Sequence, residues 1–320
     1  MVDLSVVIVS WNVRELLRRC LQSVVYSPQS SVLSRTQDDD QGLRTEIIVV
    51  DNASSDGSVE MLRAEFPNVR LIANERNLGF TRGNNQGLAL SRGRYVLFLN
   101  PDTEVVGDAL ATMVHYMDDH PDVGALGPLL RYPDGSVQSS RRRFPTLGTA
   151  LFESTLLELW WPGNPWARRY RMADWPDDVE QEVDWVVGAC LLARREVLDQ
   201  VGGFDEGFFM YSEEMDLCRR IKAAGWRVVY LPSAQVIHHE GKSSEQVVPA
   251  RHIHFQTSKV RYFRKYHGSW AAEVLRLFLL ITYVYQMVEE GLKWLLGHKR
   301  PLRAARVRAY WQVLCSGLRT

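Results

Sequence analysis

Three apolar runs in this chain each stop at a turn that carries carboxylate, amide or hydroxyl side chains. They cover residues 4–9, 46–50 and 95–99. Short runs of β-preferring residues without alternation are typical of strands buried on both faces of a parallel sheet. In an open α/β sheet, ligands lie outside the carboxyl ends of the strands. The pattern therefore predicts an α/β fold whose polar turns share one ligand site.

The second turn, residues 51–57, reads Asp-Asn-Ala-Ser-Ser-Asp-Gly. Asp51 follows the apolar run directly, where a carboxylate can hydrogen-bond a ribose or a base. Asp56 and Ser58 can cap the helix that begins at Val59. A plain strand-to-helix turn explains the same residues, and this stretch by itself leaves both interpretations open.

Other segments follow from periodicity and turn residues. Residues 74–87 are rich in Gly, Asn and Arg, which suits either a loop close to a ligand or a glycine-containing helix start. Residues 131–180 look irregular. Further helices and strands are predicted as follows: helices at 13–25, 59–66, 105–119 and after 213, and strands at 69–72, 123–130, 183–195 and 227–232.

Composition excludes some classes of protein. The 38 basic and 38 acidic residues balance, which argues against a general nucleic-acid binder. The four cysteines are scattered and show no metal-binding spacing, so we expect buried thiols of a reducing compartment. No basic start or cleavage site precedes the first strand, so no signal peptide is expected.

Two later stretches carry candidate chemistry. An aromatic run, Phe208 to Tyr211, leads into a helix start with Glu213 and Glu214. Acids in a first helical turn often serve only the helix dipole, but that does not explain the aromatic lead-in. His238 and His239 are expected in a Gly/Ser loop after a strand, which suits a metal or phosphate ligand better than a core histidine.

Residues 131–180 contain the basic triplet 141–143 and four tryptophans. The triplet is more typical of a solvated face, and the tryptophans of a core. Both could instead face an anionic, lipid-linked substrate. The tryptophans are Trp160, Trp161, Trp166 and Trp175.

The end of the chain has a different character. From about residue 270, apolar residues follow a helical spacing, and after Glu290 no residue is acidic. The longest uncharged run, 277–288, has 12 residues, whereas spanning a bilayer takes roughly 20. We predict a basic amphipathic tail on a membrane surface, with packing on the catalytic domain or a partner as the alternative.

Taken together, these stretches resemble the family 2 glycosyltransferases of the GT-A fold, in their rhamnosyltransferase-like branch. The resemblance covers roughly residues 4–265 and rests on seven motifs in order. They are Trp-Asn (11–12), Asp-Asn-Ala-Ser-Ser-Asp-Gly (51–57), Asn-Leu-Gly-Phe (77–80), Leu-Asn-Pro-Asp (99–102), Gly-Ala (188–189), Glu-Glu-Met-Asp-Leu-Cys (213–218) and His-His (238–239). It implies a mostly parallel central sheet flanked by helices, with a C-terminal helical extension. We place the catalytic domain at residues 1–268 and the tail at 269–320.

The resemblance also implies roles for matching positions. Glu214 would be the catalytic base, and Asp102 and His238 would hold the metal. Glu213, Asp216, Trp185 and Gly188 would serve the acceptor side or support the site, and Glu213 and Asp216 remain conceivable bases. Donor binding would fall to Ser10, Trp11, Asn12, Asp51, Asn77, Gly79, Asn85 and Asn100. Asn100 replaces the first acid of the family's Asp-x-Asp element, and Glu214 stands where Asp is usual.

The implied reaction is an inverting sugar transfer, since no separate nucleophile for a retaining route is evident. The donor would be a nucleoside-diphosphate sugar, dTDP-rhamnose first, and the acceptor a glycan or lipid-linked saccharide of the cell envelope. Mg²⁺ or Mn²⁺ would neutralise the leaving diphosphate. We expect a cytoplasmic enzyme, peripheral on the inner membrane face. The alternatives are an inactive nucleotide-sugar-binding scaffold and a nucleotidyltransferase.

Overall fold

The computed structural model describes residues 2–26, 30–32, 42–240, 248–297 and 299–320. Its strands are β1 Leu4–Ser10, β2 Ser30–Val32, β3 Leu43–Asp51, β4 Arg70–Ala73, β5 Tyr95–Leu99, β6 Thr103–Val105, β7 Val123–Arg131, β8 Val137–Gln138, β9 Arg141–Arg142, β10 Gln181–Val183, β11 Trp185–Val186, β12 Cys190–Arg194 and β13 Arg227–His238. Its helices are α1 Arg14–Val25, α2 Ser58–Glu65, α3 Phe80–Leu90, α4 Ala109–Asp119, α5 Leu147–Phe152, α6 Leu156–Trp160, α7 Pro165–Tyr170, α8 Arg195–Val201, α9 Glu213–Ala223, α10 Val248–Leu295 and α11 Arg300–Ser316.

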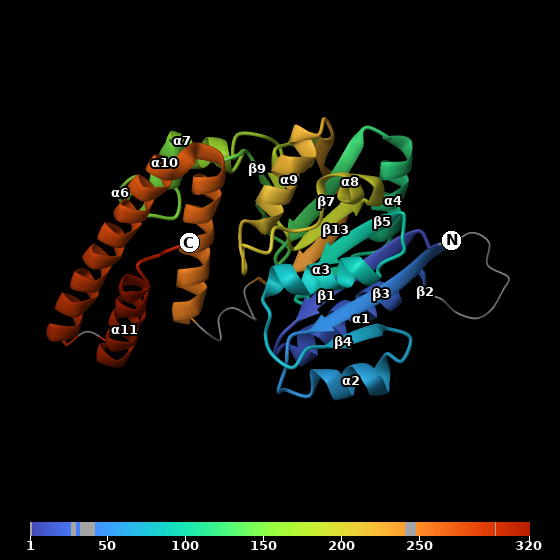
Figure 1. The fold of residues 1–320 in the computed structure, drawn as a ribbon, viewed down its shortest axis with the longest axis horizontal. Helices are drawn as coiled ribbons and strands as arrows, with labels where there is room; N and C mark the ends of the chain where they lie inside the picture. Colours follow the sequence, from blue (N-terminus) through green and yellow to red (C-terminus); the bar gives the residue numbers. More distant parts are fainter. Residues whose placement is uncertain (1, 27–29, 33–41, 241–247, 298) are drawn as a thin grey trace. The chain divides into compact units, whose positions relative to one another are not determined.

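The chain divides into two compact units. The first comprises Met1–Phe144, Arg171–Phe209 and Glu213–Ser243, and holds the sheet. The second comprises Pro145–Tyr170, Met210–Ser212 and Ser244–Thr320, and is helical. Figure 1 shows both units in sequence colours.

The first unit is built on one sheet with the order β10-β13-β7-β12-β5-β1-β3-β2, and β4 also pairs with β3. Strands β1, β3, β4 and β5 run parallel, β13 runs parallel to β7, and β12 is antiparallel to both of its neighbours. The predicted α/β class with a mostly parallel sheet and a C-terminal helical extension is confirmed.

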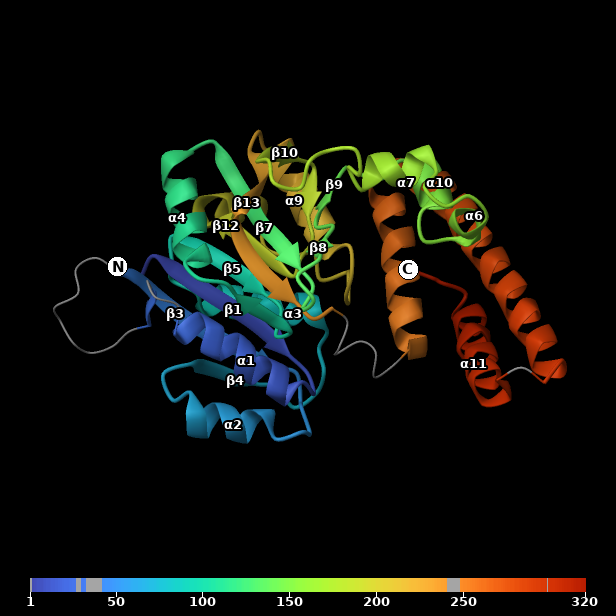
Figure 2. The same cartoon turned by 180° about the vertical axis from the view of Figure 1, so that it is seen from behind.

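Successive side chains of a buried strand point to opposite faces of the sheet, and a layer of helices packs on each face. Leu4, Val6 and Ile8 of β1 share a core with Leu17 and other residues of α1, whose buried positions recur at helical spacing. The opposite face of β1 packs against α3. Figure 2, seen from behind, shows α1 and α4 in front of the sheet, whereas α3 and α8 lie in front in Figure 1. The sheet is therefore covered on both faces.

Two glycines set the distance between α3 and the sheet. A Cβ added to Gly83 would lie 2.8 Å from Val9 Cγ1, and one added to Gly87 would lie 2.3 Å from Val7 Cγ1. Four residues separate the two glycines, so they share one helix face. Of the two interpretations left open for residues 74–87, the glycine-containing helix start therefore applies to Gly83 and Gly87, because these glycines contact the strand.

Several local predictions need correction. The single strand predicted at 183–195 is three short strands, β10, β11 and β12, because the chain bends at Asp184 and turns at Gly188. The strand at 227–232 continues to His238, so this histidine ends a strand instead of sitting in a loop. The Gly/Ser loop after it, from residue 241, lies outside the described residues.

Residues 131–180 are also more ordered than predicted. They contain β8, β9, α5, α6 and α7. The tryptophans predicted for a core are exposed, with Trp160 at 64%. Arg141 of the supposedly solvated triplet is buried, and its guanidinium lies 2.7 Å from Asp177. Three cysteines are buried as predicted, but Cys315 is exposed.

The second unit folds around a break in α10. Gly268 has φ 86° inside this helix, so residues 248–267 and 269–295 are two helices that turn back on one another. Tyr283 Oη lies 3.1 Å from His252 Nδ1 across the fold, and α11 packs alongside. The buried core of the second unit includes Tyr262, Phe263 and Leu279.

Among the described residues, Pro249–Leu295 is long and apolar enough to cross a membrane, judged by length and composition alone. Its best window has a mean hydropathy of 1.4, and 33% of that window is buried inside the protein. The sequence analysis missed this candidate membrane-spanning segment because it considered only uninterrupted uncharged runs, and two charged residues interrupt the apolar stretch.

Candidate active site

The site begins where β1 and β3 end side by side. Ser10 pairs with Asp51 in the parallel register, so their side chains leave the sheet at the same edge. Asp51 Oδ1 accepts a hydrogen bond from Ser54 N at 2.9 Å, whereas Asp51 Oδ2 and Ser10 Oγ are buried and have no hydrogen-bond partner among the residues that the structure describes. Two buried polar atoms at the carboxyl edge of the sheet are therefore left for a ligand.

The amide of Asn12, in contrast, is used inside the protein. Asn12 has φ 52° and accepts a hydrogen bond from Ser55 N at 2.7 Å, while its own N–H donates to Ser54 Oγ. These bonds tie the turn after β1 to the turn after β3. Trp11, between Ser10 and Asn12, is partly exposed.

The loop before α3 is folded tightly. Asn77 Oδ1 accepts a hydrogen bond from Gly79 N at 2.9 Å. Gly79 has φ 91°, and a Cβ there would lie 2.7 Å from the ring of Phe209, so both the backbone angle and the available space demand glycine. Phe80 N donates to Phe209 O at 2.9 Å. The aromatic run before α9 thus supports the predicted donor loop.

Asn85 has a structural task in this fold. Its side chain accepts a hydrogen bond from Phe204 N and donates one to Phe204 O, both at 2.9 Å. A second contact from the amide nitrogen reaches Glu206. These bonds hold the Gly-Gly-Phe turn against α3, and the donor-binding role assigned to Asn85 stays a prediction.

Asp102, in the turn between β5 and β6, lies close to His238 at the end of β13. Both side chains are buried, and His238 Nε2 lies 3.4 Å from Asp102 Oδ1. Two ligand atoms bound at right angles to one Mg²⁺, each at about 2.1 Å, would be about 3 Å apart. Asn100 Oδ1, two residues before Asp102, is buried, and no described residue forms a hydrogen bond with it. This donor set fits a divalent cation.

The orientation of His238 is fixed by two residues that the sequence analysis missed. Gln138 Nε2 donates to Glu240 Oε2 at 3.0 Å, and Gln138 Oε1 lies 2.9 Å from His238 Nδ1. Because a carboxylate only accepts, the amide must present its oxygen to the histidine, so Nδ1 carries the proton. The lone pair of a neutral His238 then lies on Nε2, facing Asp102.

The described residues contain no cluster of three or more His, Cys, Asp or Glu side chains that could hold a metal. Asp102 and His238 are a pair, so phosphate oxygens and water would have to complete the shell of a cation that they hold.

Glu213 and Glu214 open α9 on the other side of the site. Burial, and then the negative charge of Glu214, raise the pKa of Glu213 well above its usual range. Burial also raises the pKa of Glu214, although backbone N–H groups and the Arg142 guanidinium oppose the rise. Each carboxyl group has one oxygen, Oε2, that is buried without a hydrogen-bond partner in the described part of the chain.

Gly188 leaves the space that Glu214 occupies. A Cβ at this position would lie 3.3 Å from Glu214 Cβ and 3.5 Å from its Cδ. Trp185, three residues earlier, is buried and donates through Nε1 to Arg143 O at 3.0 Å. The turn between β11 and β12 therefore lies directly beside the candidate base.

Asp216 is engaged within the helix. Its buried carboxylate lies 2.9 Å from Arg220 Nε, and Arg220 also donates to the backbone oxygens of Val201 and Gly203. This ion pair fixes α9 to the turn after α8, which favours Glu214 over Asp216 as the base.

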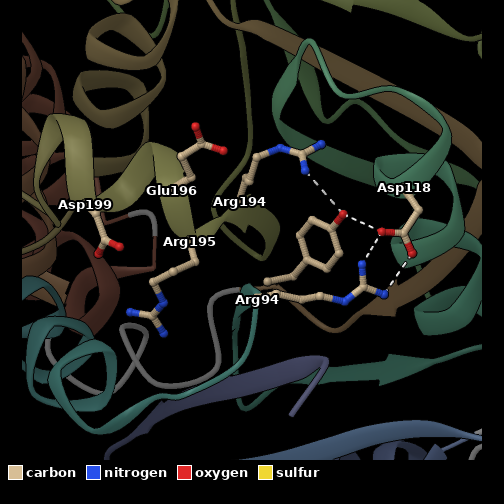
Figure 3. Close-up of a pocket in the computed structure, with 7 residues that line it drawn as sticks. Arg94, Asp118, Arg194, Arg195, Glu196 and Asp199 are labelled. Carbon is tan, nitrogen blue, oxygen red and sulfur yellow. Dashed lines mark hydrogen bonds and ion pairs between the residues drawn. The ribbon is translucent and has the colours of Figure 1, made fainter. Parts of the chain in front are cut away.

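A separate cavity of about 480 Å³ lies at the opposite edge of the sheet (Figure 3). It is lined by Tyr95, the first residue of β5, and by Arg194, the last of β12. Arg94 forms an ion pair with Asp118, which also accepts a hydrogen bond from Tyr95 Oη at 2.7 Å. These charges neutralise one another at the amino ends of the parallel strands, away from the candidate site.

Comparison with known proteins identifies the class. Residues 5–202 match the profile of glycosyl transferase family 2. The match covers more than half of the chain, and the chain belongs to this family; it is a glycosyltransferase of the GT-A fold.

Among curated proteins, the chain is 36% identical over 239 residues to N-acetylglucosaminyl-diphospho-decaprenol L-rhamnosyltransferase of Mycobacterium tuberculosis, covering 71% of this chain and 77% of that protein. It is 32% identical over 169 residues to rhamnosyltransferase WbbL of Escherichia coli K12, covering 50% of this chain and 61% of the other. These similarities confirm the resemblance to the rhamnosyltransferase-like branch.

Among solved structures, the fold is similar to mannosyltransferase PcManGT from Pyrobaculum calidifontis in complex with GDP-Man and Mn²⁺. The TM-score is 0.56 at 15% identity, with 99% of this chain and 87% of the other covered. At this identity the comparison supports the fold alone.

Proposed function

We propose that this glycosyltransferase moves a sugar from a nucleoside-diphosphate sugar to an acceptor hydroxyl, with inversion at the anomeric carbon and with Glu214 as the base. One observation carries the proposal. Among the described residues, eight buried side-chain oxygens lack a hydrogen-bond partner; three belong to Thr81, Gln181 and Gln256, and the other five belong to predicted site residues. These residues are Ser10, Asp51, Asn100, Glu213 and Glu214. Unsatisfied buried polar atoms are costly, so a polar ligand that pairs with them accounts for their presence.

In the proposed reaction, the Glu214 carboxylate takes the proton of the acceptor hydroxyl as its oxygen attacks the anomeric carbon. The bond from that carbon to the diphosphate oxygen breaks, and the diphosphate leaves with the electron pair. A single displacement of this kind inverts the configuration. Glu213, whose pKa is raised by burial and by the charge of Glu214, would support the site without acting as a base.

Asp102 and His238 would hold a divalent cation. When bound, the cation would neutralise charge on the phosphate oxygens of the leaving group. Ser10 and Asp51 would bind the nucleoside end of the donor, and the loop from Asn77 to Gly79 would close on it. Asn100, an amide in place of an acid, adds an oxygen ligand but no charge.

The proposed donor is dTDP-rhamnose and the proposed acceptor a lipid-linked saccharide of the cell envelope. The rhamnosyl group and the lipid-linked acceptor come from the similarity to the decaprenol-linked rhamnosyltransferase, and the dTDP carrier comes from the family resemblance. The proposed location is the cytoplasmic side of the membrane, where such an acceptor would be met. Turnover with dTDP-rhamnose, compared with UDP- and GDP-sugars, tests the donor.

The assignment of the base is tested with Glu214→Gln. We expect donor binding to stay within a few-fold of the wild type and transfer to fall by roughly 10²–10⁴-fold, the usual effect of losing a general base. In the wild type, transfer should fall on the acid side at a pH above the usual range of a glutamate, because only ionised Glu214 accepts the proton and burial raises its pKa.

Glu213→Gln is the matched control. Glutamine resembles a protonated glutamate, so transfer should drop only modestly. A severe loss in Glu213→Gln together with near-normal transfer in Glu214→Gln would assign the base to Glu213. A wild type that binds the nucleotide sugar without any turnover would instead be an inactive scaffold.

A further inference from the structure

An uncharged apolar stripe runs along the second half of α10. Its exposed side chains recur at intervals of three, four and seven residues, which places them on one face of the helix. They are Leu277, Ile281, Val284, Val288, Leu292 and Leu295. Ile281 is 65% exposed, and no charged residue falls on this face between 277 and 296. Exposed apolar patches of this extent mark interaction surfaces.

Residues far away in the sequence extend the stripe. The ring of Trp160, at the end of α6, contacts the ring of Tyr285 edge-on, with 5.8 Å between centroids. Leu159 and Trp161 beside it are also exposed. All of these residues belong to the second compact unit. The tryptophans of residues 156–161 thus continue the face of α10.

The opposite side of this helix is already occupied. Leu275, Leu279 and Tyr283 are buried. Glu290 is buried and forms ion pairs with Arg303 at 2.6 Å and Arg306 at 3.2 Å, both from α11. A helix that crossed the bilayer would carry these charges into hydrocarbon, whereas a helix lying in the surface keeps them on its protein side.

Basic and aromatic residues mark the far end of the stripe. The Arg300 guanidinium lies 5.7 Å from the centre of the Trp294 ring, next to exposed Lys299. No residue after Glu290 is acidic. Trp at the level of lipid headgroups and Lys or Arg facing anionic lipid are typical of interfacial helices. The charge of this end complements an anionic membrane.

We propose that the stripe on α10, together with the 159–161 segment of α6, is one membrane-docking surface that lies flat in an anionic lipid surface. The inference deepens the proposed function. It rests on that function only for the identity of the membrane, which would be the membrane that carries the lipid-linked acceptor. Docking would bring the enzyme to an acceptor that cannot leave the bilayer.

The test uses the full chain and flotation with vesicles of phosphatidylcholine, alone or mixed with phosphatidylglycerol. The double variant Ile281→Asp with Val288→Asp puts two charges on the stripe. The matched control, Tyr26→Asp with Val106→Asp, makes the same kind of change at exposed apolar residues of the first unit. Circular dichroism melting checks that both variants fold.

We expect the wild type and the control to float with mixed vesicles, and the stripe variant to bind at least about tenfold more weakly, because apolar burial is lost and charge must be desolvated. Trp160→Ala should weaken binding several-fold. Added salt should weaken binding to the mixed vesicles by screening the basic end. Transfer to a water-soluble acceptor should be equal in all variants, which separates docking from the proposed reaction.

Three results would overturn the proposal. The stripe variant could float as well as the wild type. The wild type could ignore vesicles but self-associate in a way that the stripe variant abolishes, which would assign the surface to a second copy. Retention of the chain in cell membranes through alkaline carbonate would show a spanning helix in place of a surface helix.

Discussion

At the scale of single residues, His238 shows how a candidate ligand is oriented by groups that never touch a metal. Glu240 fixes the amide of Gln138, and Gln138 fixes the proton of His238. Such partners commonly set both the ring orientation and the basicity of a histidine ligand. The proposed cation site therefore depends on four side chains, of which two face the cation.

These two hydrogen bonds, which we call the Glu240–Gln138–His238 relay, predict a graded effect on metal binding. Asp102→Asn should abolish Mn²⁺-dependent binding of the nucleoside diphosphate, because it removes the charged ligand. Gln138→Leu should weaken Mn²⁺ binding by about 10–100-fold, since the ring of His238 loses its anchor. Electron paramagnetic resonance titration of Mn²⁺ in the presence of the diphosphate measures both without any turnover.

The control is Gln235→Leu, which removes a glutamine of β13 whose Oε1 accepts a hydrogen bond from Arg131 Nε at 3.0 Å. It should bind Mn²⁺ like the wild type. Equal Mn²⁺ affinity in Gln138→Leu and the wild type would refute the relay, and unchanged diphosphate affinity in Asp102→Asn would refute the metal assignment itself.

At the scale of elements, α3 is held unusually close to β1, and the donor loop is attached to its start. Gly83 and Gly87 allow the helix to touch Val9 and Val7. Valine is stiff at χ1, so it cannot easily swing aside for an added methyl group. Because Gly79 and Phe80 begin this helix, a shift of α3 would move the loop that the donor is proposed to meet.

Gly87→Ala should therefore destabilise the first unit by about 1–3 kcal/mol, the usual cost of overpacking a core, and should weaken donor binding. Gly291→Ala is the matched change in an open helical position, where an added Cβ meets nothing within 4 Å. It should stabilise the second unit by about 0.5–1 kcal/mol. Calorimetric unfolding temperatures of both variants measure this, and a shift of both in the same direction would contradict the packing argument.

At the scale of the whole molecule, the chain folds as two compact units, and the second is assembled from three stretches of sequence. Residues 145–170 and 248–267 share it with the C-terminal helices. We propose that the catalytic residues all lie within residues 1–268, and that residues 269–320 serve the membrane. The helices on either side of Gly268 nevertheless share one core.

A chain that ends at residue 268 should consequently keep the sheet but lose part of the second unit. It would lack Tyr283, the partner of His252 and Gln256, and Glu273, which lies 2.6 Å from Arg264. We expect it to bind the nucleotide donor, yet to bind a hydrophobic dye and aggregate more readily than the full chain. A monomer with an unchanged melting profile would show that 1–268 is an independent domain.

The sequence by itself determined the sheet and its ligand-bearing edge. Uninterrupted β-branched runs such as residues 6–9 and 47–50 are typical of strands buried on both faces, and polar residues directly after them are expected at the strand ends. That is why Ser10 and Asp51 could be expected at the same edge of the sheet, whereas their direct pairing came only from the structure. The helical spacing of α1 and of the C-terminal helices was equally evident, because a helix buries every third or fourth residue.

Only the tertiary structure decided which polar groups are free for a ligand and which apolar groups are free for a partner. The side-chain amide of Asn85 is hydrogen-bonded to Phe204, which is 119 residues away in the sequence. The ring of His238 contacts Gln138, which is 100 residues away. The sequence favoured a core position for Trp160, but in the folded chain its neighbours do not cover it and its side chain is exposed. Sequence spacing sets the period and the buried face of an element, but a hydrogen-bond partner or a covering surface depends on how distant segments pack, and no local pattern encodes that.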